Sequence, residues 1–396
     1  MARNLRVGVQ RGLRQSIGGG LGTGDIFTLS PASFDFARTG TKDSRITFTR
    51  SSTGTYVAAD GLIKTAASNA ARFDHDLATG KSLGLLIEEA RTNLVIYSEQ
   101  FDNSAWTKSS GATVNLNAVA APDGTNTGSI VNFSSSSSRF FQTRSLTAGT
   151  YTLSVFLRVS SGSKALTMQV FNSTDGSQNK NITVTDSWQK FTHTVTVSNA
   201  ACQLHPVRPD DIGDVYVWGA QLEAGSFATS YIPTTSSTVT RAADVAEITG
   251  TNFSDFYNQS EGTVFAVAEA PNQTNVVVAS LSNGTNNNKI EVRSSATSLT
   301  KARGVVRTAA TVVFDKSPTA GTDRFRSLVL AYKATDSMFA ADGLLSARDT
   351  SVPLPSVSRL YLANEFNNTD LRPGHIKRLS YFPTRLPDAT LQSITS

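Results

Sequence analysis

The chain has 396 residues and a formal net charge of +5, and 17% of its residues are charged, against about 25% in an average soluble protein. Its length leaves room for about two or three domains. The single cysteine, Cys202, excludes a disulfide framework and a zinc site built from several cysteines. The chain has no apolar run of about 18 residues, so no membrane-inserted helix is expected.

The basic charge is concentrated in the first 24 residues. They include Arg3, Arg6, Arg11 and Arg14 and no acidic residue, so four of the five net positive charges lie there. The nearly neutral body is therefore not a basic nucleic-acid binder, and no nucleic-acid partner is expected. The segment lacks the apolar core of a secretory signal. Its Arg-rich, acid-free composition fits an organellar transit peptide as an alternative. Its glycines disfavour a helix, so we expect it to be disordered when free in water.

Strand patterns dominate the next part of the chain. In residues 25–97, which are irregular in composition, Ala59-Asp60-Gly61 predicts a hairpin turn between TYVA and LIKT. Apolar side chains then alternate with Ser and Thr over 150–160 and 191–197, the period-two pattern of half-buried antiparallel strands. The apolar face predicted for 150–160 consists of Tyr151, Leu153, Val155, Leu157 and Val159. Residues 214–222 are a further strand candidate.

The last part of the chain has the same character. Residues 232–245 have the composition of an extended linker, and 263–270 are again a strand candidate. A short terminal helix is predicted over 386–395, with Asp388 as its cap. Pairs that favour tight turns separate the strand candidates. These pairs are Asp123-Gly124, Asp175-Gly176, Asn283-Gly284 and Asp342-Gly343.

The sequence therefore predicts an all-β fold, in which an N-terminal anchor precedes two antiparallel β-sandwich (jelly-roll) domains. The expected boundaries are a basic Gly-rich tail over 1–24, an irregular β-rich base over 25–97, a jelly roll over 98–233, a linker over 234–245 and a second sandwich over 246–396.

Two long segments support a family resemblance. Residues 48–108, from FTRSSTGTYVAADG to EQFDNSAWTK, resemble a segment found in virion proteins of tailed bacteriophages and prophages. In those proteins this segment precedes a carbohydrate-binding-module-like jelly roll, which ends in a stretch similar to residues 215–245. Residues 246–396 resemble a concanavalin A-like sandwich of the laminin G type, through EGTVFAVAEA near their start and HIKRLSYFPTRLPDATLQSIT at their end.

The resemblance implies a structural fibre or spike protein located in the virion, on the tail or the head. Such proteins are commonly homotrimers that bind other virion proteins through the N-terminus and host-surface polysaccharide through distal lectin domains. The arginines of the tail suit docking to acidic protein surfaces. Two alternatives stay open: an enzyme that degrades capsular polysaccharide, and a purely structural connector or decoration protein.

The sequence contains few candidates for a chemical site. The tryptophans Trp106, Trp188 and Trp218 could stack on sugars, but core packing is favoured for each, because Trp is highly buried on average. Trp188 and Trp218 are also expected on strands. Asp74-His75-Asp76 could hold a metal, but turn chemistry accounts for it better. Glycoside hydrolysis needs two carboxyl groups in one cleft, and no spacing singles out a pair. The scattered candidates are Glu88, Glu89, Asp214 and Glu223, so no catalytic residue is assigned.

One loop is rich in oxygen ligands. The segment NEFNNTD includes Asn364, Glu365 and Asp370, and concanavalin A-like sandwiches often bind calcium through such loops. An ordinary Asn-rich turn is the alternative. No cofactor is expected otherwise, and the sequence does not indicate which loops bind a glycan.

Overall fold

The computed structural model describes residues 26–269, 276–294, 302–318, 327–363 and 374–396. Strands account for 54% of the structure and helices for 6%, so the all-β prediction is confirmed. No helix among these residues is long and apolar enough to cross a membrane. The residues predicted to anchor the chain or to bind calcium lie outside the described ranges. They are Arg3, Arg6, Arg11, Arg14, Asn364, Glu365 and Asp370.

The chain forms two compact units. Unit 1 combines the chain up to Thr49 with Ser82–Glu89 and Ala243–Ser396, and unit 2 combines Arg50–Lys81 with Ala90–Ala242. This division differs from the expected boundaries, because the segment 25–97 is shared between both units and does not form a base of its own. Pairing between strands that lie far apart in the sequence causes the difference, and composition does not reveal such pairing.

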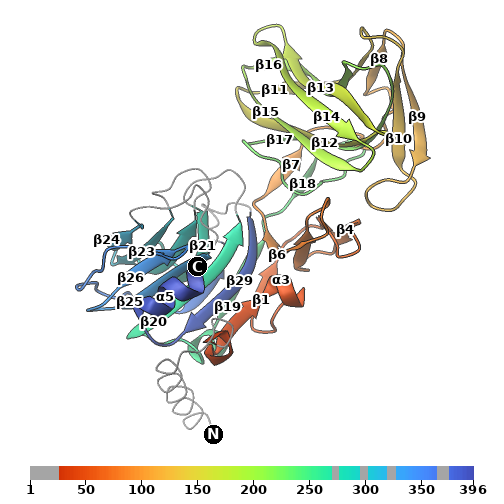
Figure 1. Ribbon diagram of the computed structural model, residues 1–396. Coiled ribbons are helices and arrows are strands. Elements are labelled where there is room, and N and C mark those ends of the chain that lie inside the picture. The colour runs from red at the N-terminus through yellow and green to blue at the C-terminus, as the bar shows by residue number, and fades with distance from the viewer. Residues whose placement is uncertain (1–25, 270–275, 295–301, 319–326, 364–373) are drawn as a thin grey trace. The chain divides into compact units, whose positions relative to one another are not determined.

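Unit 2 is a sandwich of two five-stranded antiparallel sheets (Figure 1). Sheet I has the order β15 (Gln189–Val197), β12 (Gly149–Arg158), β17 (Gly213–Ala224), β10 (Gly128–Phe133) and β9 (Ala112–Val119). Sheet II has the order β14 (Gly176–Thr185), β13 (Ser163–Asn172), β16 (Ala200–Pro209), β11 (Arg139–Leu146) and β8 (Thr107–Ser109). Smaller elements complete the unit: the hairpin of β3 (Gly54–Val57) and β4 (Ile63–Ala66), the strand β5 (Arg72–His75), and the pair of β7 (Arg91–Asn93) and β18 (Val239–Arg241).

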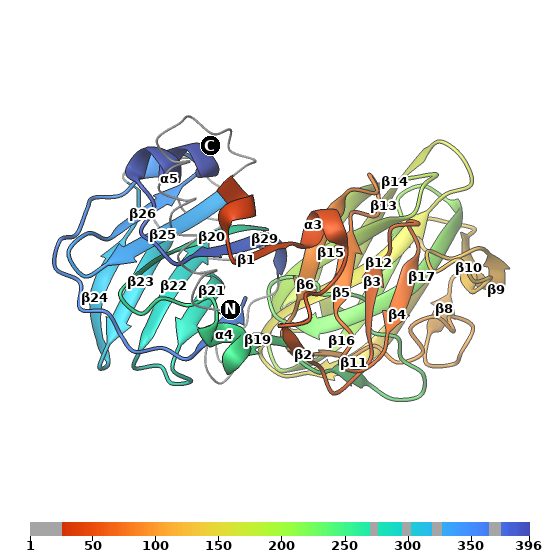
Figure 2. The ribbon, with the colours of Figure 1, turned by 90° about the horizontal axis from the view of Figure 1, so that it is seen from below.

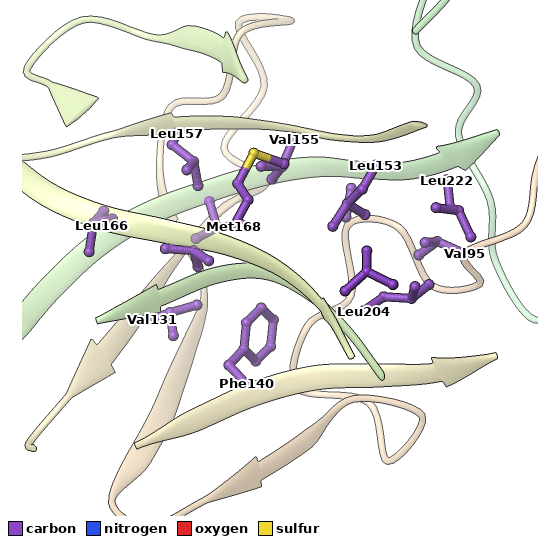
Figure 3. Packing of buried hydrophobic residues seen from close by; sticks show 14 of the residues in the cluster. Val95, Val131, Phe140, Leu153, Val155, Leu157, Leu166, Met168, Leu204 and Leu222 are labelled. Atoms are coloured by element: carbon purple, nitrogen blue, oxygen red, sulfur yellow. The ribbon is translucent and has the colours of Figure 1, made fainter. Parts of the chain in front are cut away.

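The core of unit 2 lies between the two sheets. Leu153, Val155 and Leu157 of β12 are fully buried and belong to one hydrophobic cluster with Leu166 and Met168 of β13. Figure 3 shows these side chains converging from the two sheets. The apolar face predicted for 150–160 is therefore confirmed.

The segment after the jelly roll is more ordered than a linker. Strand β18 lies inside the range 234–245 that was expected to be a linker, and it pairs with β7 through Val239 and Asn93 at one end. Thr is favourable in strands, and the Thr240 hydroxyl lies 2.8 Å from that of Thr92 across the pair.

Unit 1 is also built from two antiparallel sheets. The first has the order β27 (Leu344–Leu345), β26 (Met338–Ala341), β25 (Ser327–Lys333), β20 (Glu261–Glu269), β29 (Gly374–Phe382) and β6 (Ser82–Ile87), and β1 (Ala32–Asp35) also pairs with β29. The second has the order β2 (Thr47–Thr49), β19 (Val245–Thr249), β28 (Arg359–Leu362), β21 (Val276–Ser282), β22 (Lys289–Ser294), β23 (Arg303–Thr308) and β24 (Thr311–Lys316). Three short helical segments, η1 (Phe27–Leu29), α3 (Phe36–Thr39) and α4 (Thr251–Ser254), accompany them.

The terminal helix α5 (Asp388–Thr395) confirms the helix predicted over 386–395. It packs against β25 and β26, as Figures 1 and 2 both show. The predicted cap is wrong: Pro387 precedes the helix, and Asp388 is its first residue. The Asp388 carboxylate forms ion pairs with Arg385, at 2.6 Å, and with Arg348, so it is not used as a cap.

Candidate functional site

The side of sheet II that faces away from the core carries polar and aromatic side chains. Along β13, Leu166, Met168 and Val170 point into the core, so Thr167 and Gln169 between them lie on the opposite side. The same alternation applies to β14, β16 and β11. We call the residues of these four strands that point away from the core the polar face. It consists of Arg139, Phe141, Thr167, Gln169, Asn179, Asn181, Gln203, His205 and Arg208.

Strand register aligns these residues in two rows across β14, β13 and β16. Gln169 pairs with Asn179 on one side and with His205 on the other. Thr167 pairs in the same way with Asn181 and Arg208. Directly opposed residues on one side of a sheet have their Cβ atoms roughly 5 Å apart, so each row is a contiguous surface.

A β-bulge in β16 places His205 and Arg208 on the same side of the sheet. The register shifts between Thr167 and Gln169, so two steps on β13 correspond to three steps on β16. Residues three apart on a regular strand point to opposite sides, and the extra residue of a bulge reverses this relation. Pro206 lies inside the bulge, where its missing N–H costs no ladder hydrogen bond.

Three polar side chains of the polar face are deeply buried. His205 is 1% exposed, Gln169 is 4% exposed and Thr167 is 6% exposed. Buried polar groups need hydrogen-bond partners. The Gln169 amide donates to Asn179 Oδ1 at 2.6 Å, and the Thr167 hydroxyl donates to Asp210 Oδ2 at 2.7 Å.

The imidazole of His205 packs against an aromatic ring. Its centroid lies 4.8 Å from that of Phe141, and its Nε2 lies 3.4 Å from Gln203 Oε1. Its Nδ1 is buried and makes no hydrogen bond of normal geometry within the described residues. Burial, together with the positive charges of Arg208 and Arg139, lowers the pKa of His205 to about 3. The ring is therefore neutral at neutral pH.

The two arginines of the polar face form no ion pair among the described residues. Arg139 donates to the carbonyl oxygens of Ser136 and Ser138, at 3.2 and 2.9 Å. Burial and the charge of Arg139 lower the pKa of Arg208. The Asp210 carboxylate partly offsets this lowering. The buried Nε of Arg208 has no hydrogen-bond partner in the described part of the chain.

These groups suit binding better than catalysis. Amide, hydroxyl and guanidinium groups can hydrogen-bond to a polyhydroxylated ligand, and the Phe141 ring offers an apolar surface beside them. Asp210 borders this surface, and its carboxylate already accepts a hydrogen bond from Thr167. Glycoside hydrolysis requires two carboxyl groups about 5–9.5 Å apart.

The carboxylates singled out from the sequence do not form a site. Glu88 and Glu89 belong to unit 1, and Asp214 and Glu223 belong to unit 2. The last two lie nine residues apart on β17, which is about 30 Å along an extended strand. Glu223 is fully buried and accepts a hydrogen bond from the Thr229 amide at 2.9 Å, so its role is structural.

Two of the three tryptophans are core residues, as predicted. Trp106 is 1% exposed and stacks on Phe140, with ring centroids 4.9 Å apart, and Trp218 is 2% exposed. Trp188 is only partly buried. Its Nε1 donates to the Ala120 carbonyl at 3.1 Å, and its ring packs against a hydrophobic cluster that contains Trp218.

The Asp74-His75-Asp76 motif makes local contacts. Asp74 accepts from the Val57 amide at 2.7 Å, and His75 Nδ1 lies 3.1 Å from the Val57 carbonyl oxygen. Asp76 accepts from both the amide and the hydroxyl of Thr79, which lowers the pKa of this carboxyl. The described residues contain no group of three or more His, Cys, Asp or Glu side chains arranged to hold a metal. The interpretation as turn chemistry applies to Asp76, whereas Asp74 and His75 lie on β5 and contact Val57.

Sequence reasoning missed the polar face. The alternation Leu166-Thr167-Met168-Gln169-Val170 is visible, but it is the same pattern as that of a solvent-exposed strand face. Cross-strand register and the bulge at Pro206 bring Gln169, His205 and Arg208 together, and neither can be read from one strand.

Comparisons with known proteins give only distant matches. No family model matches the chain, and no curated protein matches it. Among solved structures, the enzymatically active domain of tailspike protein 4 of bacteriophage CBA120 aligns at 17% identity over 33% of this chain, with a TM-score of 0.27. This chain spans only 21% of that domain.

Two further solved structures also align with part of this chain. The CBM40 of the Ruminococcus gnavus IT-sialidase aligns at 16% identity over 35% of this chain and 84% of its own length, with a TM-score of 0.28. Domains LG4-5 of the mouse laminin α1 chain align at 10% identity over 71% of this chain and 89% of their own length, with a TM-score of 0.23. Similarity this low carries no information about ligands or activity.

Proposed function

We propose that the chain is a non-enzymatic fibre or spike protein of a bacteriophage virion, on the tail or the head, that attaches to host-surface polysaccharide through the polar face of unit 2. The attachment role rests on one observation: His205, Gln169 and Thr167 are buried on the side of sheet II away from the core, beside an aromatic ring and two arginines. The virion role rests on the resemblance of residues 48–108 and 215–245 to phage virion proteins.

The chemistry of the polar face matches that of a saccharide. Sugars present hydroxyl groups at their edges and C–H groups on their faces, so they need hydrogen-bonding groups beside an apolar surface. The exposed amides of Asn179 and Asn181 supply the first, and the half-buried Phe141 ring supplies the second. All three are on strands, and groups held on a sheet lose little conformational freedom on binding.

The tail is proposed to bind other virion proteins. Arg3, Arg6, Arg11 and Arg14 can each form bidentate contacts with carboxylates of an acidic partner. A homotrimer in the virion is part of the same proposal, and the mass of the purified chain in solution tests it.

The test of glycan binding uses the full-length chain. Unit 1 needs β1 and β6, and unit 2 includes 50–81, so a truncation that starts at residue 98 would damage both units. We expect the chain to bind host cells or polysaccharides from their surface, and Phe141→Ala to weaken this binding at least about tenfold. Thr196→Ala is the control, because Thr196 is exposed on β15 of the other sheet.

Each outcome separates the candidate functions. Binding that Phe141→Ala removes and Thr196→Ala retains supports the proposal. The absence of binding to any host cell or polysaccharide overturns it and leaves a connector or decoration role. A fall in polysaccharide chain length during incubation with the protein overturns it in favour of a depolymerase.

A further inference from the structure

Two cationic side chains of the polar face form no ion pair among the residues that the structure describes. Arg139 at the start of β11 and Arg208 next to the bulge of β16 both lie on the outward side of sheet II. Several other arginines among the described residues do form ion pairs; Arg385 with Asp388 at 2.6 Å and Arg293 with Glu291 at 2.6 Å are examples. Neither Arg139 nor Arg208 makes such a contact within the described residues.

The surroundings of these two arginines favour an external anion. Asp210 attracts Arg208 electrostatically, and it accepts the Thr167 hydroxyl at 2.7 Å. Asp211 accepts from the backbone amide of Ala165 at 2.8 Å. Neither carboxylate forms an ion pair with a guanidinium in the described part of the chain, so neither guanidinium is held by direct contact with an acidic side chain there.

The partly buried position strengthens any charge contact made there. The Nε of Arg208 is buried and has no hydrogen-bond partner among the described residues, so no protein acceptor holds the guanidinium at that atom. A guanidinium presents parallel N–H groups that match the two oxygens of a carboxylate. Charge-assisted hydrogen bonds are stronger where water is partly excluded, as beside His205, which is 1% exposed.

We propose that the saccharide bound by the polar face carries carboxylate groups, and that Arg139 and Arg208 bind those groups. This inference rests on the proposed function, because it names the class of glycan that the same surface recognises. Asn179, Asn181 and Phe141 hold the neutral part of the saccharide, while the arginines select for acidic sugars such as uronic acids.

The experiment is an array of bacterial surface polysaccharides, each printed in its native form and after chemical reduction of its carboxyl groups. The full-length chain is compared with Arg139→Gln and Arg208→Gln. We expect wild-type binding to acidic polysaccharides to fall about 10- to 100-fold after carboxyl reduction, and each substitution to cause a similar loss on the native form. Binding to native acidic polysaccharides is also expected to weaken as NaCl is added.

A matched control removes the same charge from the other side of the sheet. Arg144→Gln lies on β11 at a position whose side chain points away from the polar face, so it should leave binding unchanged. Tryptophan fluorescence checks that each variant is folded, because all three tryptophans lie in unit 2.

The outcomes distinguish this inference from the proposed function. Binding to neutral polysaccharides alone, or binding to acidic ones that both arginine variants retain, overturns the inference and leaves glycan binding intact. Binding that needs the arginines but survives carboxyl reduction overturns the carboxylate assignment in favour of phosphate or sulfate esters. The absence of binding to every polysaccharide overturns the proposed function itself.

Discussion

Replacement of His205 by Gln should remove a pH dependence from the stability of unit 2. His205 is 1% exposed, and its pKa in the folded protein is lowered to about 3 by burial and by Arg208 and Arg139, from a usual value of 6.5. As the pH falls below 6.5, the unfolded chain binds a proton at this residue and the folded chain does not. Stability that is fully present above pH 6.5 is therefore lost progressively as the pH falls.

The magnitude follows from the two pKa values. Each pH unit between them lowers the free energy of unfolding by about 1.4 kcal/mol at most. Between pH 8 and pH 5 the loss from His205 amounts to about 2 kcal/mol, because the interval from pH 8 to 6.5 contributes little. The loss of about 2 kcal/mol changes little for any folded-state pKa below about 4, because pH 5 lies above every such pKa.

Urea unfolding followed by tryptophan fluorescence measures this effect in unit 2 alone, because Trp106, Trp188 and Trp218 all lie there. The pKa of His193 is also lowered, by burial, but this residue is present in both proteins and cancels in the comparison. His375→Gln, in unit 1, is the control and should leave the fluorescence transition unchanged. An equal loss of stability from pH 8 to pH 5 in wild type and His205→Gln would refute the reasoning.

Three further predictions concern the cores and the tail. Leu153→Ala opens a cavity in the core of unit 2, so the free energy of unfolding of unit 2 in urea should fall by about 2–5 kcal/mol. A fall of less than about 1 kcal/mol would contradict the burial of Leu153 in this core. Gly84 has φ +94°, and a Cβ there would collide with the Ile376 carbonyl oxygen. Gly84→Ala should therefore lower the melting temperature of unit 1 in calorimetry. An unchanged transition would argue against the pairing of β6 with β29. Deletion of residues 1–24 should leave both units folded by circular dichroism and abolish incorporation into particles; full occupancy of the truncated chain would disprove the anchor.

The local features of the fold could be predicted because they depend on neighbouring residues. The hairpin at Ala59-Asp60-Gly61 connects β3 and β4, and Gly124, Gly176 and Gly284 have the positive φ that their turn signals indicate. The prediction of the Asp388 cap was wrong because ion pairs with Arg348 and Arg385, from other parts of the fold, compete for its carboxylate.

The candidate site could not be predicted, because its residues come from four strands. Phe141, Gln169 and His205 are 28 and 36 residues apart along the chain, and each looks like an ordinary outward-facing strand residue. Their proximity depends on strand order and register in sheet II, which single-strand patterns do not specify.

The sequence by itself determined the all-β class of the fold and the concentration of positive charge in residues 1–24. Both can be read from short stretches of sequence, because hydrophobic periodicity and net charge depend only on which residues are close along the chain. Tertiary structure decided how the segment 25–97 is shared between two units and which polar residues share a surface. The physical reason is that an antiparallel strand can pair with many partners in many registers. Only the packing of the whole chain selects β29 as the partner of β1 and β6, and only the bulge at Pro206 aligns Arg208 with His205.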